Sequence, residues 1–125
     1  MSRDGRFAES VVDALAKAKI IGVRAGTEHR HTGVWVVVVK DRVFARSWSD
    51  KPTGWFRAFK KQRSGTIQVG KLELPVRSKD VRSASVRDAV TKAFGEKYNT
   101  KASQKWVDGF AEPARVATTL EFVPG

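Results

Sequence analysis

Cysteine is absent from this 125-residue sequence, and histidine, with two residues, and methionine, with one, are scarce. Without cysteine the chain cannot form a disulfide framework, a thiolate nucleophile or a cysteine–zinc site. No apolar run approaches the roughly twenty residues that cross a membrane. Residues 1–19 carry charges throughout and lack the apolar core and cleavage site of a signal peptide. We therefore expect a cytoplasmic protein with no membrane partner.

Common catalytic motifs are also missing. The sequence has no Gly-x-Ser-x-Gly turn, no Walker-type phosphate loop and no Gly-x-Gly-x-x-Gly fingerprint. His29 and His31 stand two residues apart, but a metal site needs a third ligand, and Arg30 between them adds a repelling charge. We interpret this run as an exposed polar loop and expect no metal site. If the chain is an enzyme, a cofactor supplies the reactivity, and catalytic residues stay unassigned.

What the sequence does contain is an excess of positive charge. Its 24 Lys and Arg residues outnumber 13 Asp and Glu residues, which gives a net charge of +11. This balance favours an anionic partner, such as a phosphorylated cofactor, a nucleic acid or an acidic membrane surface. Hydrophobic residues make up 41% and charged residues 30% of the chain, proportions typical of a globular protein.

Hydrophobic periodicity predicts a helix followed by several strands. Apolar residues at three- and four-residue spacings indicate an amphipathic helix over residues 4–17. The valine-rich run 34–39 is the strongest strand signal, and Lys40-Asp41 can close a hairpin onto residues 43–48. Further expected elements are a strand over 19–24, a short helix over 55–61, strands 66–69 and 72–76 joined at Gly70-Lys71, helices capped by Ser83 or Ser85 and by Thr100, and a strand over 114–123.

Together these elements predict one α+β domain over residues 1–125 with a small antiparallel barrel at its core. Its expected parts are an N-terminal helix (1–18), the barrel core (19–81), a helical crossover (83–111) and a final strand (114–123).

Several residues have a structural interpretation beside a functional one. Trp35, inside the valine run, is expected in the core, and Tyr98 and Trp106 are expected to pack. Trp55 suits the plug of a barrel end as well as a cofactor wall. Arg46 interrupts an apolar strand, and a buried arginine normally requires an anionic partner.

Residues 43–76 are the most informative run, VFARSWSDKPTGWFRAFKKQRSGTIQVGKLELPV. Its motifs are Pro52 and Gly54-Trp55-Phe56 entering the short helix, then Ile67-Gln68-Val69-Gly70 and Leu74-Pro75-Val76 on the following strands. This order resembles the deazaflavin-dependent nitroreductase-like family, part of the pyridoxamine-phosphate-oxidase-like FMN-binding split-barrel superfamily. Overall the sequence is most similar to a small bacterial family of unknown function, domain of unknown function 2255, that carries the same run.

The resemblance implies a six-stranded antiparallel split β-barrel with flanking helices. It further implies a homodimer that holds FMN or a deazaflavin near the subunit interface. Basic and hydroxyl groups match the oxygens of the cofactor phosphate, and indoles offer a flat face to the ring. Carried over by position, the nominated cofactor-binding residues are Arg24, Thr27, Arg30, Arg46, Ser47, Trp48, Lys51, Trp55 and Arg57.

One loop departs from the family pattern. Deazaflavin-binding relatives carry a Thr-Gly-x-Lys-Ser-Gly-type loop before the second strand, where this sequence reads Ala-Gly-Thr-Glu-His-Arg-His over residues 25–31. The lysine and the serine are missing, and Glu28 adds negative charge. FMN, a deazaflavin, another anionic ligand and no cofactor therefore all remain open.

The sequence supports three functional hypotheses. The first is a flavin- or deazaflavin-type cofactor-binding protein, an oxidoreductase or reductase whose substrate the sequence does not name. The second is a basic nucleic-acid-binding module, because aromatic and basic residues interleave over residues 48–63. The third is a cofactor-less split-barrel dimer with a binding role.

Overall fold

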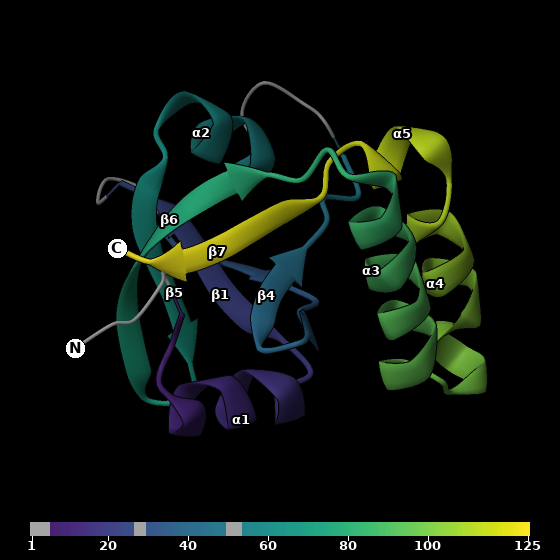
Figure 1. The fold of residues 1–125 in the computed structure, drawn as a ribbon, viewed down its shortest axis with the longest axis horizontal. Coiled ribbons are helices and arrows are strands. Elements are labelled where there is room, and N and C mark those ends of the chain that lie inside the picture. Colours follow the sequence, from purple (N-terminus) through teal and green to yellow (C-terminus); the bar gives the residue numbers. More distant parts are fainter. Residues whose placement is uncertain (1–5, 27–29, 50–53) are drawn as a thin grey trace.

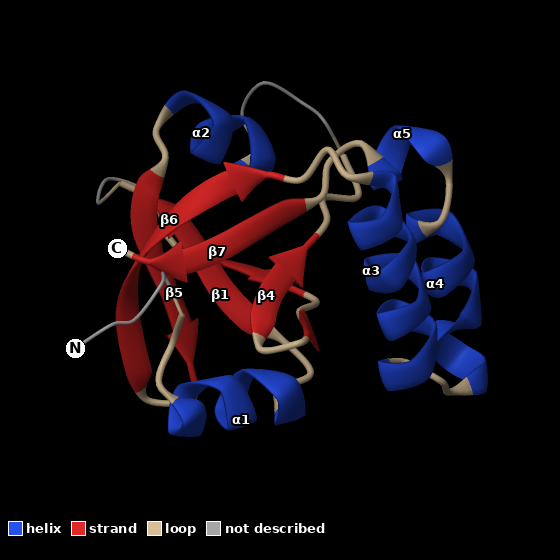
Figure 2. Ribbon diagram, viewed as in Figure 1, coloured by secondary structure: helices blue, strands red, loops and turns tan. Residues whose placement is uncertain are grey.

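The computed structural model describes residues 6–26, 30–49 and 54–125 (Figure 1). These residues form one antiparallel sheet flanked by helices (Figure 2). The elements, in chain order, are α1 Glu9–Lys17, β1 Ile21–Ala25, β2 Thr32–Val34, β3 Val37–Val39, β4 Arg42–Ala45, α2 Trp55–Lys61, β5 Ser64–Val69, β6 Leu72–Asp80, α3 Ala84–Lys97, the 3-10 helix η1 Lys101–Ser103, α4 Gln104–Phe110, α5 Pro113–Val116 and β7 Leu120–Pro124. No helix among them is long and apolar enough to cross a membrane.

The sheet is curled so that its two edges approach each other. Its strand order is β2-β1-β5-β6-β7-β4-β3, and neighbouring strands are antiparallel. The edge strands β2 and β3 are joined by only Trp35 and Val36, so their facing ends lie within about 11 Å of each other. Figure 1 shows α1 beneath one end of the sheet, α2 at the other, and α3 beside α4. The predicted α+β class is confirmed.

Within the described residues the sheet has seven strands rather than the predicted six, because the valine run is interrupted. At the interruption Val36 bonds to side chains of α3 and its C-cap instead of a neighbouring strand. The Val36 N–H donates to Tyr98 Oη at 3.1 Å, and the Val36 carbonyl accepts from Lys97 Nζ at 2.6 Å and from Tyr98 Oη at 3.2 Å. These partners lie about sixty residues away in the chain, so no local pattern signals the break.

Two hydrophobic clusters form the core. The larger one fills the curled sheet with side chains from β1, β4, β5 and β7, closed by Leu15 of α1 and by Phe56 and Phe59 of α2. The smaller one packs α3 against β3 and β4 through Phe44, Phe94 and neighbouring residues. Phe44, Phe59 and Leu15 are fully buried. The interior of the curled sheet and the helical layer are therefore two packed layers that share β4.

Several local predictions are confirmed. Lys40 and Asp41 have positive φ angles of 51° and 64°, as a tight hairpin turn requires, and Gly70 has a φ of 58° at the second hairpin. The hydroxyl of Ser83 accepts from Val86 N–H and caps α3. Thr100 likewise caps η1 through the N–H of Ser103. Helix α2 spans Trp55–Lys61, as the pattern indicated.

The predicted final strand over 114–123 is wrong in its first half. Residues Pro113–Val116 form α5, because Pro113 suits the first position of a helix. The hydroxyls of Thr118 and Thr119 then donate to the carbonyls of Arg115 and Val116 and close the turn, so β7 begins only at Leu120. Helix α1 likewise begins at Glu9 rather than at residue 4, and β4 ends at Ala45 rather than at residue 48.

Candidate functional site

All four tryptophans of the chain line one cavity of about 310 Å³, here called the tryptophan cavity. Trp35 comes from the link between β2 and β3, Trp48 from the segment after β4, Trp55 from the start of α2 and Trp106 from α4. The other described lining residues are Ile20, Gly33, Val34, Arg46 and Phe110. The described lining thus contains one cation and no carboxylate.

Trp35 is held in the cavity wall by Tyr98. Their rings stack with centroids 3.8 Å apart and an interplanar angle of 2°. Tyr98 is itself fixed, because its hydroxyl donates to the carbonyl of Lys19 at 2.6 Å and contacts Val36 on both backbone groups. Burial raises the pKa of Tyr98 to about 12, so the hydroxyl remains a donor at neutral pH. The interruption of the valine run therefore positions the Trp35 ring as an aromatic wall of the tryptophan cavity.

Trp55 and Trp106 are anchored differently. Trp55 contacts Phe59 and Phe122 of the larger core cluster, with ring centroids 6.4 Å away in both cases. Trp106 is 42% exposed and meets the ring of Trp48 edge-on at a centroid distance of 4.9 Å. One side of the cavity thus continues the packed core, and the other is formed by exposed indoles.

Arg46 brings a buried positive charge to the wall. Its residue is 2% exposed, and its guanidinium donates to Thr119 Oγ1 at 2.7 Å, Thr91 Oγ1 at 2.8 Å, the Phe110 carbonyl at 2.9 Å and the Arg87 carbonyl at 2.8 Å. All four acceptors are neutral. Burial lowers the pKa of Arg46 to about 10, with a further lowering from Arg87 and an opposing effect of Asp88. The cation persists at neutral pH with its charge unpaired by any of these contacts.

The nominated residues fall into two groups. Arg46, Trp48 and Trp55 meet at the tryptophan cavity. Ser47 is buried beside them, and its N–H donates to Thr118 Oγ1 at 2.9 Å while its hydroxyl donates to the carbonyl of Ser49.

Arg24, Arg30 and Arg57 are not among the described residues that line this cavity. Arg24 lies on β1 with its Nη2 3.6 Å from a carboxylate oxygen of Glu73. Its Nε is buried and has no hydrogen-bond partner within the described residues. Arg30 is exposed, and Arg57 is exposed on α2. Thr27 and Lys51 lie outside the described residues.

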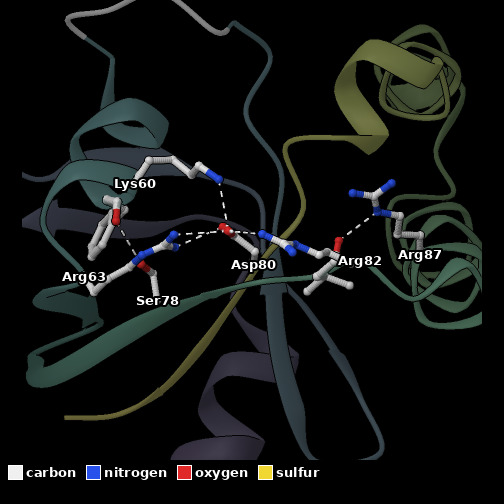
Figure 3. A network of polar contacts seen from close by, with 8 residues as sticks. Lys60, Arg63, Ser78, Asp80, Arg82 and Arg87 are labelled. Carbon is white, nitrogen blue, oxygen red and sulfur yellow. Dashed lines mark hydrogen bonds and ion pairs between the residues drawn. The ribbon is translucent and has the colours of Figure 1, made fainter.

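A second polar feature is the Asp80 cluster, formed by Lys60, Arg63, Asp80 and Arg82 (Figure 3). Arg63 binds both carboxylate oxygens, at 3.0 and 3.1 Å, Lys60 Nζ lies at 3.0 Å and Arg82 Nη2 at 3.8 Å. The hydrogen bond from Arg63 is the main cause that lowers the pKa of Asp80 to about 2. Three cations surround one carboxylate, so the cluster carries a surplus of two positive charges at neutral pH.

No group of three or more metal-ligating side chains occurs within residues 6–26, 30–49 and 54–125. His31 Nε2 instead lies 3.0 Å from Thr66 Oγ1 and 4.0 Å from a carboxylate oxygen of Glu73. Both contacts involve the same ring nitrogen. In a nucleophile–base–acid chain the hydroxyl and the carboxylate bind opposite nitrogens, so this arrangement does not form one.

Comparison with known proteins assigns this chain to a family. The family described as "Uncharacterized protein conserved in bacteria (DUF2255)" matches residues 11–122. The chain belongs to this family. It is also similar in structure to the conserved hypothetical protein Rv2991 from Mycobacterium tuberculosis, with a TM-score of 0.59 and 13% identity over 98% of this chain and 82% of that one. At this identity the likeness concerns the fold alone. No curated protein matches the chain.

Three aromatic residues of the cavity were not foreseen as site residues. Trp35 was expected in the core, Trp106 was expected to pack, and Phe110 was assigned no functional role. Their role depends on α4 folding back beside the segment after β4, which sequence spacing does not encode. The available signal was the count of four tryptophans in a chain of this length, more than the packing of one small core demands.

Proposed function

We propose that the chain binds FMN or a deazaflavin, with the planar ring in the tryptophan cavity. The observation that carries this proposal is the convergence of all four tryptophans on one cavity with a buried guanidinium in its wall. A volume of about 310 Å³ lies at the lower end of small-molecule sites, which suits a ring system rather than a whole dinucleotide.

The family resemblance of residues 43–76 supports the same proposal. In that reading the curled sheet is a six-stranded split barrel, in which β2 and β3 count as a single interrupted strand. Strands β2 and β3 follow each other in the chain, yet β2 pairs with β1 at one edge of the sheet and β3 pairs with β4 at the other. One interrupted strand that links the two edges of a barrel would pair in this way.

Each wall has a role in this proposal. The indoles provide apolar faces for stacking and exclude water from the ring. Arg46 acts through its charge rather than through a direct bond, because protein oxygens occupy four of its five N–H donors. A fixed positive charge favours a ring that carries or gains negative charge. A bound flavin or deazaflavin would supply hydride-transfer chemistry, and the chain would supply position and electrostatics.

The proposal is tested by titrating FMN and a deazaflavin separately and following the quenching of tryptophan fluorescence. We expect saturable quenching by one of them. Trp106→Ala should weaken that binding about ten-fold or more, because an aromatic stack contributes ~1–3 kcal/mol. Leu72→Ala is the matched control, since Leu72 is a similarly exposed apolar residue (48%) on the β5–β6 hairpin and lines no part of this cavity. No saturable signal from either ligand at high micromolar concentration would refute the proposal.

The Asp80 cluster favours a second candidate function, the binding of single-stranded nucleic acid. Its three cations offer more donors than the two oxygens of Asp80 accept, and Arg82 is 85% exposed in its side chain. The exposed ammonium and guanidinium groups match the phosphates of a nucleic-acid backbone.

This second candidate predicts a salt-dependent affinity for a fluorescent single-stranded DNA. Losing two phosphate contacts should reduce the slope of log affinity against log salt by about 1.4. We expect this reduction for Lys60→Gln with Arg82→Gln. The control pair Lys92→Gln with Lys101→Gln removes the same charge from exposed positions on α3 and η1. An equal effect of the two pairs would show that only net charge matters and would exclude the cluster as the binding surface.

A further inference from the structure

Trp48 is an exposed indole that the protein nevertheless holds in one position. The residue is 40% exposed, yet its ring meets Phe110 edge-on at a centroid distance of 5.3 Å and Trp106 at 4.9 Å. The guanidinium of Arg115 lies over the ring, with its central carbon 3.6 Å from the centroid. An exposed tryptophan does not need three such contacts for packing, so these contacts indicate that the position of the Trp48 ring matters for function.

Arg115 binds both the ring and the backbone of Trp48. Its Nε donates to the carbonyl of Trp48 at 3.0 Å, while its Nη1 donates to Glu112 Oε2 at 2.7 Å and to the carbonyl of Gly109 at 3.4 Å. The guanidinium thereby ties α4 and α5 to the segment after β4. Because its plane is bound at one edge by Trp48 and at another by Glu112, Arg115 cannot leave the ring without losing both contacts.

Gly109 makes room for the indole. A Cβ atom at this position would lie 2.2 Å from Cη2 and 2.5 Å from Cζ3 of Trp48, far inside contact distance. Gly109 is buried within α4, where glycine lowers helix stability relative to alanine. The cost of this glycine is thus explained by the close approach of the Trp48 ring.

The indole separates two cavities. Trp48 and Trp106 line the tryptophan cavity and also a second, outer cavity of about 560 Å³. Arg115 and Gly109 line only the outer one. The guanidinium therefore approaches the Trp48 ring from the side of the outer cavity, and the same indole also borders the tryptophan cavity.

The geometry points to Trp48 as the platform on which the ligand ring stacks, with Gly109 and Arg115 as positioning residues that fix its indole. This inference rests on the proposed function, because it names the ring-contacting residue of the same cavity. It goes beyond the family resemblance, which nominated Trp48 by position alone and gave no role to Gly109 or Arg115.

The sharpest test is a pair of glycine-to-alanine changes. Gly109→Ala introduces a methyl group that must displace the Trp48 ring, whereas Gly95→Ala in α3 meets only Val107 Cγ1 at 3.9 Å, an ordinary contact. Both changes favour helix formation equally. We expect Gly109→Ala to weaken binding of FMN or the deazaflavin about ten-fold and Gly95→Ala to leave it within two-fold. Equal affinities of the two variants would overturn the inference.

Arg115 provides a second test if Gly109→Ala fails to fold. Arg115→Gln should weaken ligand binding about ten-fold, as expected for loss of a close cation–π contact that orders the platform. Arg115→Lys should resemble Arg115→Gln, because an ammonium retains the charge but lacks the flat guanidinium and its Nε donor. Arg77→Gln is the matched control, because it removes the same charge from an exposed arginine of β6 that lies outside this cluster, and it should bind ligand normally. Rescue by lysine would show that charge, and not positioning, matters.

A ligand-free measurement separates this inference from the proposed function. The close Trp48–Trp106 pair should give an exciton couplet in far-ultraviolet circular dichroism. We expect Gly109→Ala and Arg115→Gln to reduce the couplet and Gly95→Ala to retain it; an unchanged couplet in all three would contradict the positioning role. If wild type binds neither ligand, the proposed function fails whatever the couplet shows, and the platform assignment fails with it.

Discussion

A buried arginine was expected to need an anion, and Arg46 shows another solution. Its four hydrogen bonds end on two threonine hydroxyls and two backbone carbonyls drawn from α3, α4 and the turn before β7. The strand pattern correctly indicated that residue 46 is special, because a cation interrupts an apolar run. It could not show that the acceptors lie 41 to 73 residues further along the chain.

Arg46→Met is therefore predicted to destabilise the protein severely. The change removes the donor to the Phe110 carbonyl and to the hydroxyls of Thr91 and Thr119 in a buried site, while the Arg87 carbonyl still accepts from Thr91 Oγ1. We expect a loss of about 3 kcal/mol in the free energy of unfolding, measured by urea denaturation. Arg77→Met is the control, because Arg77 is exposed on β6 and makes one 3.3 Å hydrogen bond to Ser64. A similar small effect of both changes would contradict the structural role of Arg46.

At the scale of elements, the Asp80 cluster links α2 to the sheet. Lys60 belongs to α2, Arg63 precedes β5 directly, and Asp80 ends β6. The hydroxyl of Ser78 adds a bond to the carbonyl of Phe59 in the same helix. Helix α2 carries Trp55, so these contacts also fix one wall of the tryptophan cavity.

This linkage predicts a loss of stability in acid. The pKa of Asp80 is about 2 in the folded protein against an ordinary value of 3.8, so the unfolded chain binds its proton first. The contribution of Asp80 is complete above pH ~4 and is lost as the pH falls to about 2, a change of about 2 kcal/mol. Urea denaturation across this range should show the free energy of unfolding falling with pH in wild type. Glu96→Gln, a change at an exposed carboxylate of α3, should show the same slope of free energy against pH. Asp80→Asn should remove that slope; a wild-type slope in Asp80→Asn would refute the assignment.

The elements differ in how far sequence could predict them. Hairpins at Lys40-Asp41 and Gly70, helix α2 and the caps of α3 and η1 depend on neighbouring residues, and the sequence predicted them. The break at Val36 depends on Tyr98 and Lys97. Helix α5 was missed because alternating apolar residues after Pro113 suit a strand as well as a turn closed by threonine hydroxyls. The candidate site shows the same difference. Arg46, Trp48 and Trp55 could be nominated because they lie in one contiguous run of the sequence. Trp35 and Trp106 are distant from that run in the chain, and only the folded structure places them in the cavity.

For the whole molecule, the exposed apolar residues around the tryptophan cavity raise the question of assembly. Ile20 is 52%, Trp48 40% and Trp106 42% exposed, and all three line this cavity. We propose that a second copy of the chain covers this rim, which would enclose the cavity. Each copy carries a net charge of +11, so the two copies repel each other, and the apolar rim must overcome that repulsion.

A dimer held in this way should become tighter as salt is added, because salt screens the repulsion and leaves the apolar contact in place. Light scattering over micromolar concentrations should give the mass of two chains, with a dissociation constant that falls from low to high salt. Ile20→Lys should shift the mass toward one chain, because it adds a charge at the rim. Leu72→Lys adds the same charge at an equally exposed residue on the β5–β6 hairpin and should leave the dimer intact. A monomer mass under all these salt conditions, or an equal effect of the two lysines, would exclude the rim as the interface.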